Sequence, residues 1–465
     1  MTQQDPAKQG STAEQVLRTV QVKRNDVSAA GIRMWALDFP AHERLVDLGQ
    51  ASLTVQGWAL WTVAPAQLPQ LLLEAGGELV HVQPFNTKRP DVIERVLHEP
   101  PVCHGQLCCG FLARIPAAKL ASGFRVGLRV GEAEPIWLAQ VALVPPVQVL
   151  EGSDGWLFLD NDSNHSVDQY TGKRLLSADE LGAWRDYLGG VHALAQRMGL
   201  RHAMVLAPSK EEVLRHRYPH ERAVTTVLDQ VCALAAPEWN VLDAAPVLGA
   251  HVPPEACFKQ TDTHWTDRGA MLATLAVLPH LGLDASQAQA LFAQDVYVLR
   301  NEVGDLGCKL LPVRSAPTEF LQGPAPEAGA VFDNRLPNIG RTLVFENAGA
   351  LHPFKVLVFG ASSGYPMLKY LKRIFSRVVF VHSAAQVDVG VVAYEKPDAL
   401  LLQSNGRFLV QAPHMRFSLA DAVRTKLSEA SPALKNSIRE WLATMPANPS
   451  EKLYREMLLS AYELQ

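Results

Sequence analysis

The pattern of apolar residues changes near Pro145-Pro146, and this change divides the chain into two kinds of structure. Before it, apolar and polar residues alternate in short runs, as at 124–130, and glycines separate the runs. Alternation with a period of two predicts strands that each bury one face, with turns between them. Residues 26–145 are therefore predicted to form a β-sandwich-like domain, preceded by a flexible arm over residues 1–25.

Beyond residue 146, apolar runs alternate with helical patterns. Ser177-Ala-Asp-Glu180 has the form of a capping box, and apolar residues follow it at helical spacing. The uninterrupted apolar run at 355–359 is typical of a strand that is buried on both faces. The alternation predicts an α/β domain over residues 146–415, with a parallel sheet flanked by helices. Residues 416–465 are helical in pattern, and we expect these C-terminal helices to pack on that domain.

The composition argues against several classes of partner. The 465 residues include 43 Lys and Arg against 47 Asp and Glu, a net charge of -4, which gives no reason to expect a nucleic acid. No run approaches the roughly 20 apolar residues of a membrane span. The first residues lack the apolar core of a secretory signal, so we expect a cytoplasmic protein, or a periplasmic one if its native start differs. The six cysteines are spread thinly and show no zinc-ligand spacing, so no metal and no cofactor is expected.

The densest chemical signal is the segment Thr261-Asp-Thr-His-Trp265. An Asp two residues before a His can hold one imidazole nitrogen and leave the other free for a nucleophile. Thr266 or Asp267 can cap the helix that the following residues predict. The alternative is that Asp262 and His264 are ordinary polar residues near a helix start.

A second signal is Gly360-Ala-Ser-Ser-Gly364, which follows the buried strand pattern at 355–359. A strand that breaks into a helix presents a hydroxyl at the carboxyl end of a parallel sheet, where open α/β folds bind ligands. The alternative is a tight connection made of small residues. Together, the two segments supply a nucleophile, a base and an orienting carboxylate.

The two segments resemble parts of the circularly permuted SGNH-hydrolase-like domain of the alginate O-acetyltransferases, the AlgX and AlgJ type. The resemblance extends over about residues 147–410, and its most specific match is to the family's Asp-Thr-His-Trp signature at 262–265. In ordinary SGNH enzymes the Asp and His follow the Ser, whereas in the permuted domain they precede it, as they do here. The other matching segments are 152–159, 207–210, 304–307, 360–362 and 395–408.

The resemblance implies roles for three residues. Ser362 would take the acetyl group, His264 would act as general base and then general acid, and Asp262 would orient His264. The family has Asp or Thr where this chain has Ala361, so polar support beside the nucleophile is lost. Ser363 is the alternative nucleophile.

Further residues are candidates for substrate binding: Trp265, Arg407 and Lys210. Trp265 would stack on a sugar face, and the two cations would bind an anionic glycan or an acyl donor. The alternatives are core packing for the tryptophan and a solvated charge or an internal ion pair for each cation. Trp58, Trp61 and Trp137 are either a sugar platform or, more simply, part of the core of the β domain.

The function predicted from these residues is an O-acyltransferase, most simply an O-acetyltransferase, that modifies a polysaccharide or glycan precursor through a serine acyl-enzyme. Its expected partners are the glycan, an acyl donor and other bacterial polysaccharide-assembly proteins. Two alternatives remain open. The same triad would serve a carbohydrate esterase, and Ala361 with the β domain would suit a non-catalytic glycan-binding or assembly subunit.

Overall fold

The computed structural model describes residues 16–42, 44–121, 123–144, 149–430, 432–444 and 451–463. The chain divides into two compact units. The first is Met1–Val147 with Ser431–Ala433, and the second is Gln148–Ala430 with Leu434–Gln465. The domain boundary that the sequence predicts, at Pro145-Pro146, lies outside the described residues. Within the described ranges, no helix is both long enough and apolar enough to cross a membrane.

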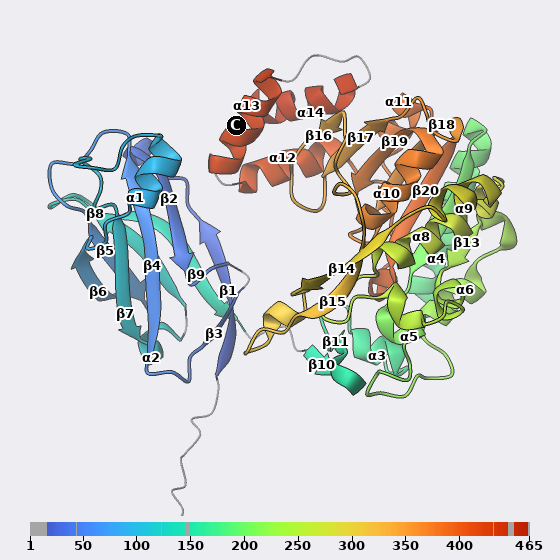
Figure 1. The fold of residues 1–465 in the computed structure, drawn as a ribbon, viewed down its shortest axis with the longest axis horizontal. Coiled ribbons are helices and arrows are strands. Elements are labelled where there is room, and N and C mark those ends of the chain that lie inside the picture. Colours follow the sequence, from blue (N-terminus) through green and yellow to red (C-terminus); the bar gives the residue numbers. More distant parts are fainter. Residues whose placement is uncertain are drawn as a thin grey trace, which may run out of the picture. The chain divides into compact units, whose positions relative to one another are not determined.

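The first unit consists mainly of strands, as the alternating pattern predicts (Figure 1). They are β1 (Leu17–Arg24), β2 (Ile32–Phe39), β3 (Leu45–Asp47), β4 (Ser52–Trp61), β5 (Gln70–Ala75), β6 (Glu78–Pro84), β7 (Gly110–Pro116), β8 (Phe124–Arg129) and β9 (Ile136–Val144), with the short helices α1 (Pro90–Val92) and α2 (Ala117–Leu120). Six strands form an antiparallel sheet in the order β3-β1-β9-β8-β5-β6, and β2-β4-β7 form a second. Both sheets contribute to one apolar core, for example through Val55 of β4 and Val126 of β8.

One prediction for this unit needs correction. Residues 17–24 of the predicted arm form β1, which pairs with β9 and β3, while residues 1–15 lie outside the described residues. For Trp58 and Trp61 the core interpretation is the correct one, because both are buried. Trp137 is half-buried, and the guanidinium of Arg125 lies 4.0 Å from its ring centroid.

The second unit contains a seven-stranded sheet. Its strands are β12 (Arg201–Ala207), β13 (Val241–Asp243), β16 (Phe332–Asp333), β17 (Thr342–Glu346), β18 (His352–Gly360), β19 (Phe375–His382) and β20 (Ala399–Asn405). They lie in the order β13-β12-β20-β18-β19-β17-β16. The first five strands in this order pair in parallel. Strand β17 pairs antiparallel with β19, and β16 pairs antiparallel with β17. The sheet is therefore mixed, and the α/β character of the unit is confirmed.

Helices cover both faces of this sheet (Figure 1). They include α4 (Ala178–Met198), α6 (Val227–Leu234), α8 (Asp267–Val277), α10 (Gly364–Ile374), α11 (Val389–Glu395), α12 (Leu419–Glu429), α13 (Pro432–Thr444) and α14 (Lys452–Glu463). Val356 and Val358 of β18 pack in the cluster that includes α8 and α10. Leu357 and Phe359 pack in the opposite cluster, with α4 and the C-terminal helices. Burial on both faces explains why the strand is an uninterrupted apolar run.

The N-terminus of α4 forms as the sequence predicts. Ser177 and Glu180 make a complete capping box, which fixes the point where the helix starts. The shorter elements of this unit are β10 (Val149–Glu151), β11 (Leu157–Leu159), α3 (Ser166–Tyr170), α5 (Lys210–Val213), α7 (Ala245–Gly249) and α9 (Ser286–Phe292).

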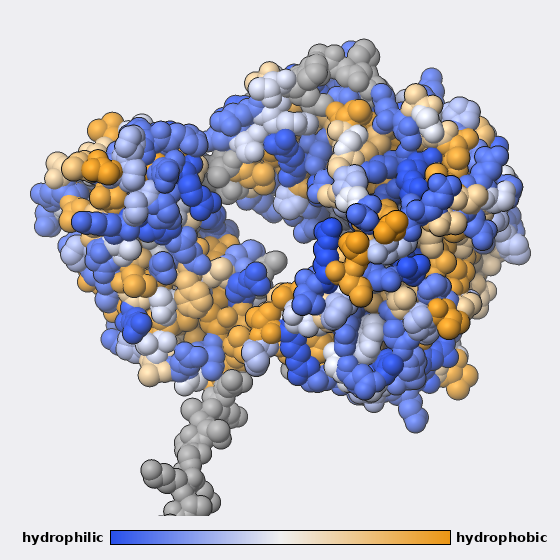
Figure 2. Space-filling model, viewed as in Figure 1, coloured by the Kyte–Doolittle hydropathy of each residue, from blue (hydrophilic) through white to orange (hydrophobic). Residues whose placement is uncertain are grey.

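A hairpin of β14 (Tyr297–Glu302) and β15 (Ala316–Leu321) lies apart from the seven-stranded sheet and braces the Asp-Thr-His-Trp segment. Lys259 donates to Glu302 at 2.8 Å, and Arg268 donates to Glu319 at 2.7 Å. Figure 2 shows apolar residues on the surface along this hairpin, where Leu299 is exposed. The hairpin thus holds the segment from both of its ends.

The carboxyl ends of the parallel strands meet at one edge of the sheet. The register places Gly360 of β18 opposite His382 of β19, and Ala207 of β12 opposite Asn405 of β20. Open α/β sheets bind ligands at this edge, because loops from neighbouring strands diverge there.

Candidate active site

Ser362 lies between β18 and α10, at the edge where the parallel strands end. Gly360, the last residue of β18, has no room for a side chain, because a Cβ there would lie 2.6 Å from the ring of Phe380. Ala361 is buried, whereas Ser362 is partly exposed. The chain therefore turns out of the buried strand at Gly360 and presents the Ser362 hydroxyl at the surface of the sheet edge.

His264 and Asp262 lie just before α8, and the structure brings both to Ser362. The Nε2 atom of His264 lies 2.7 Å from Oγ of Ser362, and its Nδ1 atom lies 2.7 Å from Oδ1 of Asp262. The segment is held in place because Thr266 caps α8 through a hydrogen bond from the Gly269 N–H. With Nδ1 protonated and facing the carboxylate, Nε2 is free to accept the serine proton.

The carboxylate of Asp262 is buried and fully engaged. Besides the imidazole, it accepts hydrogen bonds from the backbone N–H groups of His264 at 2.8 Å and Asp305 at 2.9 Å. Burial alone would raise the pKa of Asp262, but the hydrogen bond and charge of His264, aided by Lys259 and the Asp305 N–H, hold it well below its usual range. Asp262 is thus ionised at neutral pH.

Asp305 is a second carboxylate beside His264. Its segment resembles the family's, but its position at the site was not predicted from the sequence. It accepts from the N–H of Thr263 at 2.7 Å and from its hydroxyl at 2.5 Å, and one oxygen lies 3.7 Å from Nδ1 of His264. Gly304 permits the approach, because a Cβ there would lie 2.3 Å from that of Asp262. Asp262, His264 and Asp305 could together hold a metal ion. However, both imidazole nitrogens already face Asp262 or Ser362, so the arrangement fits a hydrogen-bonded triad better than a ligand set.

The prediction that Lys210 binds substrate is wrong in this structure. Its ammonium is buried and lies within hydrogen-bond distance of three backbone carbonyls, those of Lys259, Gln260 and Asp262, at 2.9, 3.2 and 2.9 Å. An ammonium has three N–H donors, so none remains for a ligand. Burial lowers the pKa of Lys210 to about 7, against the opposing charge of Asp262. Lys210 therefore anchors the backbone of the segment that carries Asp262 and His264.

Trp265 also does not reach a ligand. Its side chain is buried, and its indole N–H donates to the backbone carbonyl of Ser363 at 3.0 Å. The core alternative is the correct one, because this hydrogen bond ties the segment before α8 to the turn after β18. Ser363 is itself buried, and Ser362 is the serine that faces His264.

Arg407 lies on a cleft of about 460 Å³ that opens beside Ser362. Other residues from the ends of β19 and β20 also line the cleft, including His382, Ser404 and Phe408. Among the described residues that line it, Arg407 alone carries a permanent charge. Burial and the charge of Arg341 lower the pKa of His382 to about 4, which keeps that imidazole neutral.

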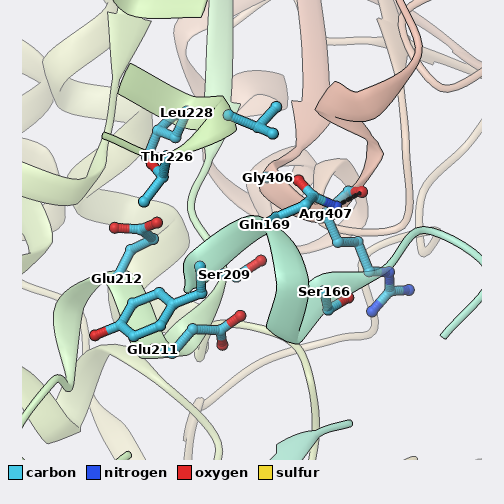
Figure 3. A pocket seen from close by; sticks show the side chains of 11 residues that line it. Ser166, Gln169, Ser209, Glu211, Glu212, Thr226, Leu228, Gly406 and Arg407 are labelled. Carbon is cyan, nitrogen blue, oxygen red and sulfur yellow. Dashed lines mark hydrogen bonds between the residues drawn. The ribbon is translucent and has the colours of Figure 1, made fainter. Parts of the chain in front are cut away.

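Within the described ranges, Arg407 has a buried Nε atom without a hydrogen bond. It also lines a second, smaller cavity with Ser166, Gln169 and Glu211 (Figure 3). Its role as a ligand contact stays a prediction, and its location beside Ser362 suits that role.

Asn405 is a site residue that sequence reasoning did not identify. It ends β20, and its side-chain N–H donates to Oγ of Ser362 at 3.2 Å. The side-chain oxygen of Asn405 accepts a hydrogen bond from the side-chain N–H of Gln403. The side-chain oxygen of Gln403 accepts one from the backbone N–H of Ala361. An asparagine at the carboxyl end of an apolar strand was the available signal, but its proximity to Ser362 requires β20 to lie beside β18.

A family model matches part of the chain. Residues 149–327 match the family described as the SGNH hydrolase-like domain of acetyltransferase AlgX, a range that includes Asp262 and His264 and ends before Ser362. No curated protein matches the chain.

Three solved structures are similar in part. Bacillus cereus PatB1 with a sulfonyl adduct has 12% identity, covers 56% of this chain and 95% of its own, and gives a TM-score of 0.43. The O-acetyltransferase domain of Pseudomonas putida AlgJ has 16% identity, covers 60% of this chain and 99% of its own, and gives a TM-score of 0.35. A DHHW family protein from Eubacterium siraeum has 11% identity, covers 62% of this chain and 92% of its own, and gives a TM-score of 0.40. Residues 149–327 are thus similar to the SGNH hydrolase-like domain of the AlgX acetyltransferase family.

Proposed function

We propose that the chain is an O-acetyltransferase that carries an acetyl group on Ser362 and passes it to a hydroxyl of a polysaccharide or glycan precursor. The observation that supports this most strongly is the unbroken contact from Ser362 through His264 to Asp262, with both distances at 2.7 Å. The match to an acetyltransferase family supports the same chemistry.

In the first half-reaction, Oγ of Ser362 attacks the acetyl carbonyl of the donor while Nε2 of His264 takes the hydroxyl proton. The bond from the carbonyl carbon to the donor oxygen breaks, and His264 returns the proton to that oxygen. Asp262 stays ionised and stabilises the imidazolium. The product is an acetyl ester of Ser362.

Negative charge develops on the carbonyl oxygen during this attack. The N–H of Asn405 that faces Oγ of Ser362 is within reach of that oxygen, because the oxygen is bonded to the carbon that Oγ attacks. A fixed donor in a site partly shielded from water is worth roughly 10²–10³ in rate. Asn405 is the donor that we assign to this role.

In the second half-reaction, a glycan hydroxyl attacks the acetyl ester and gives its proton to His264. The bond from the acetyl carbon to Oγ of Ser362 breaks, and His264 returns the proton to Oγ, which restores the serine. The cleft beside Ser362 supports a glycan acceptor because amide, hydroxyl and imidazole groups dominate its polar lining. Arg407 adds a positive charge, which suits an acceptor with a carboxylate or another anionic group.

The test is acetyl transfer by purified protein with Ser362→Ala and, as a matched control, Ser363→Ala. The first variant should lose transfer, and the second should keep it, because the Ser363 hydroxyl is not part of the triad. Full activity in the first variant would sink the assignment.

Incubation with an acetyl ester, with and without acceptor glycan, distinguishes a transferase from an esterase. A transferase acetylates the glycan and releases acetate slowly without it, whereas an esterase releases acetate equally fast in both reactions. Labelling of Ser362 by a fluorophosphonate would count against a non-catalytic subunit.

A further inference from the structure

Gln403 is a buried polar residue inside the apolar strand β20, and the triad alone does not explain it. The strand is apolar from Ala399 to Leu402, and Gln403 is fully buried beside the end of β18. A buried amide is costly unless each of its groups has a partner. Gln403 meets this condition with two groups of the active site.

The two hydrogen bonds of Gln403 have a fixed direction. The Ala361 N–H can only donate, so the oxygen of Gln403 must face it, at 2.8 Å. The side-chain N–H of Gln403 then faces the oxygen of Asn405, at 3.0 Å. This leaves the N–H of Asn405 directed at Oγ of Ser362, at 3.2 Å.

The direction matters because either end of the Asn405 amide could face Ser362. With its oxygen toward the serine, Asn405 would accept the hydroxyl proton and compete with Nε2 of His264. It would also direct the negative end of its amide dipole at the substrate carbonyl oxygen, which gains negative charge during the reaction. With its N–H toward the serine, the hydroxyl proton is left for His264.

We infer that Gln403 is a positioning residue that fixes the amide of Asn405 with its N–H toward Ser362. The inference rests on the proposed function of Ser362. Because Gln403 is anchored on the main-chain N–H of Ala361, this support needs no polar side chain at that position. The relay thus compensates for the side chain that the chain lacks beside its nucleophile.

The test is a double-mutant cycle with Gln403→Met, Asn405→Ala and the double variant. Methionine has a similar volume but lacks both hydrogen-bonding groups. The readout is acetylation of Ser362 by p-nitrophenyl acetate, followed as a burst of p-nitrophenol. We expect Gln403→Met to lower the rate constant of the burst about 10-fold, with little change in KM. The loss is smaller than the roughly 10²–10³ that one oxyanion donor supplies, because Asn405 keeps its N–H and loses only its fixed direction.

The cycle separates positioning from a general structural effect. If Gln403 acts through Asn405, adding Gln403→Met to Asn405→Ala should cause little further loss beyond that of Asn405→Ala alone. Gln230→Met is the control, because Gln230 also accepts one hydrogen bond and donates one, both to Leu176, away from the site. It should leave the burst unchanged.

Additive losses in the cycle, or a full burst in Gln403→Met, would overturn the inference while leaving Ser362 as the nucleophile. Thermal melting of each variant identifies any that fails to fold, and fluorophosphonate labelling of folded Gln403→Met then gives a second rate to compare with wild type. Failure of the wild type to give a burst or to react with the fluorophosphonate would instead overturn the proposed function, and the inference with it.

Discussion

At the scale of single residues, the site depends on how each polar group is oriented. Asp262 holds the imidazole so that Nε2 faces Ser362, and it does so as a buried carboxylate with a lowered pKa. An asparagine there could present its own N–H to Nδ1, which would favour the wrong imidazole tautomer.

Asp262→Asn should therefore lower the rate of acetyl transfer about 10³-fold or more, with a smaller effect on KM. Asp305→Asn, which changes the carboxylate that lies 3.7 Å away, should cost much less. Stopped-flow measurement of both variants checks the prediction, and equal losses would show that the two carboxylates share the orienting role.

Arg407 gives a prediction about the acceptor. Arg407→Ala should raise KM about 10-fold for an acceptor that carries a carboxylate, because one charge-assisted contact is lost. It should change KM little for a neutral acceptor of the same length. Initial rates with a uronic acid oligomer and a neutral oligomer test this, and equal effects on both would remove Arg407 from anion binding.

The residues of the triad could be predicted because each lies in a short, recognisable segment. Asn405 and Gln403 could not, since their role depends on β20 lying beside β18, a pairing of distant segments. Lys210 and Trp265 were assigned to ligand binding because a charged and an aromatic side chain in a family-like motif suit that role. Their burial depends on packing that the sequence does not display.

At the scale of elements, the segment before α8 is a loop that other elements must hold. Lys210 at the start of α5 binds its three carbonyls, and the β14–β15 hairpin braces it at both ends. Such a loop has few ladder hydrogen bonds of its own, so these contacts keep Asp262 in place.

Lys210→Met should leave three carbonyls with lost partners, which costs on the order of 2–4 kcal/mol in the free energy of unfolding. It should also lower acetyl transfer, because Asp262 loses its support. Lys173→Met, at an exposed lysine in the same unit, is the control. Denaturant melts measure the first effect, and an unchanged melt for Lys210→Met would show that the three contacts contribute little.

The long elements were the easiest to predict. The capping box of α4 and the apolar run of β18 are local signals, and both elements form where they indicate. Strand β1 was missed because it carries several charged and polar residues and depends on pairing with β9, more than 100 positions later. Strands β16 and β17, which pair antiparallel, were also missed, because the local sequence pattern does not specify the direction in which a strand pairs.

At the scale of the whole molecule, two buried histidines should make stability depend on pH. Burial, with the charge of His192, lowers the pKa of His202 to about 4 from 6.5. Burial and Arg341 lower that of His382 to about 4 as well. Between these values the unfolded chain binds more protons than the folded one, so acidification through this window favours unfolding.

Stability of the second unit should therefore fall as the pH drops from about 6.5 toward 4, by on the order of 3 kcal/mol for each histidine. His202→Phe should weaken this dependence, because the ring stays and the titrating group is removed. Replacement of the exposed His220 by Gln should not. Urea melts at several pH values give the comparison, and parallel profiles for all three proteins would contradict it.

The central claim is that Ser362 becomes acetylated during turnover. Its most direct test is mass spectrometry of protein quenched soon after mixing with an acetyl donor in the absence of acceptor. We predict one added acetyl group on the peptide that contains Ser362, its loss when glycan acceptor is added, and no such group in Ser362→Ala. An acetyl group that forms at another residue, or none at all while glycan is still acetylated, would contradict the account.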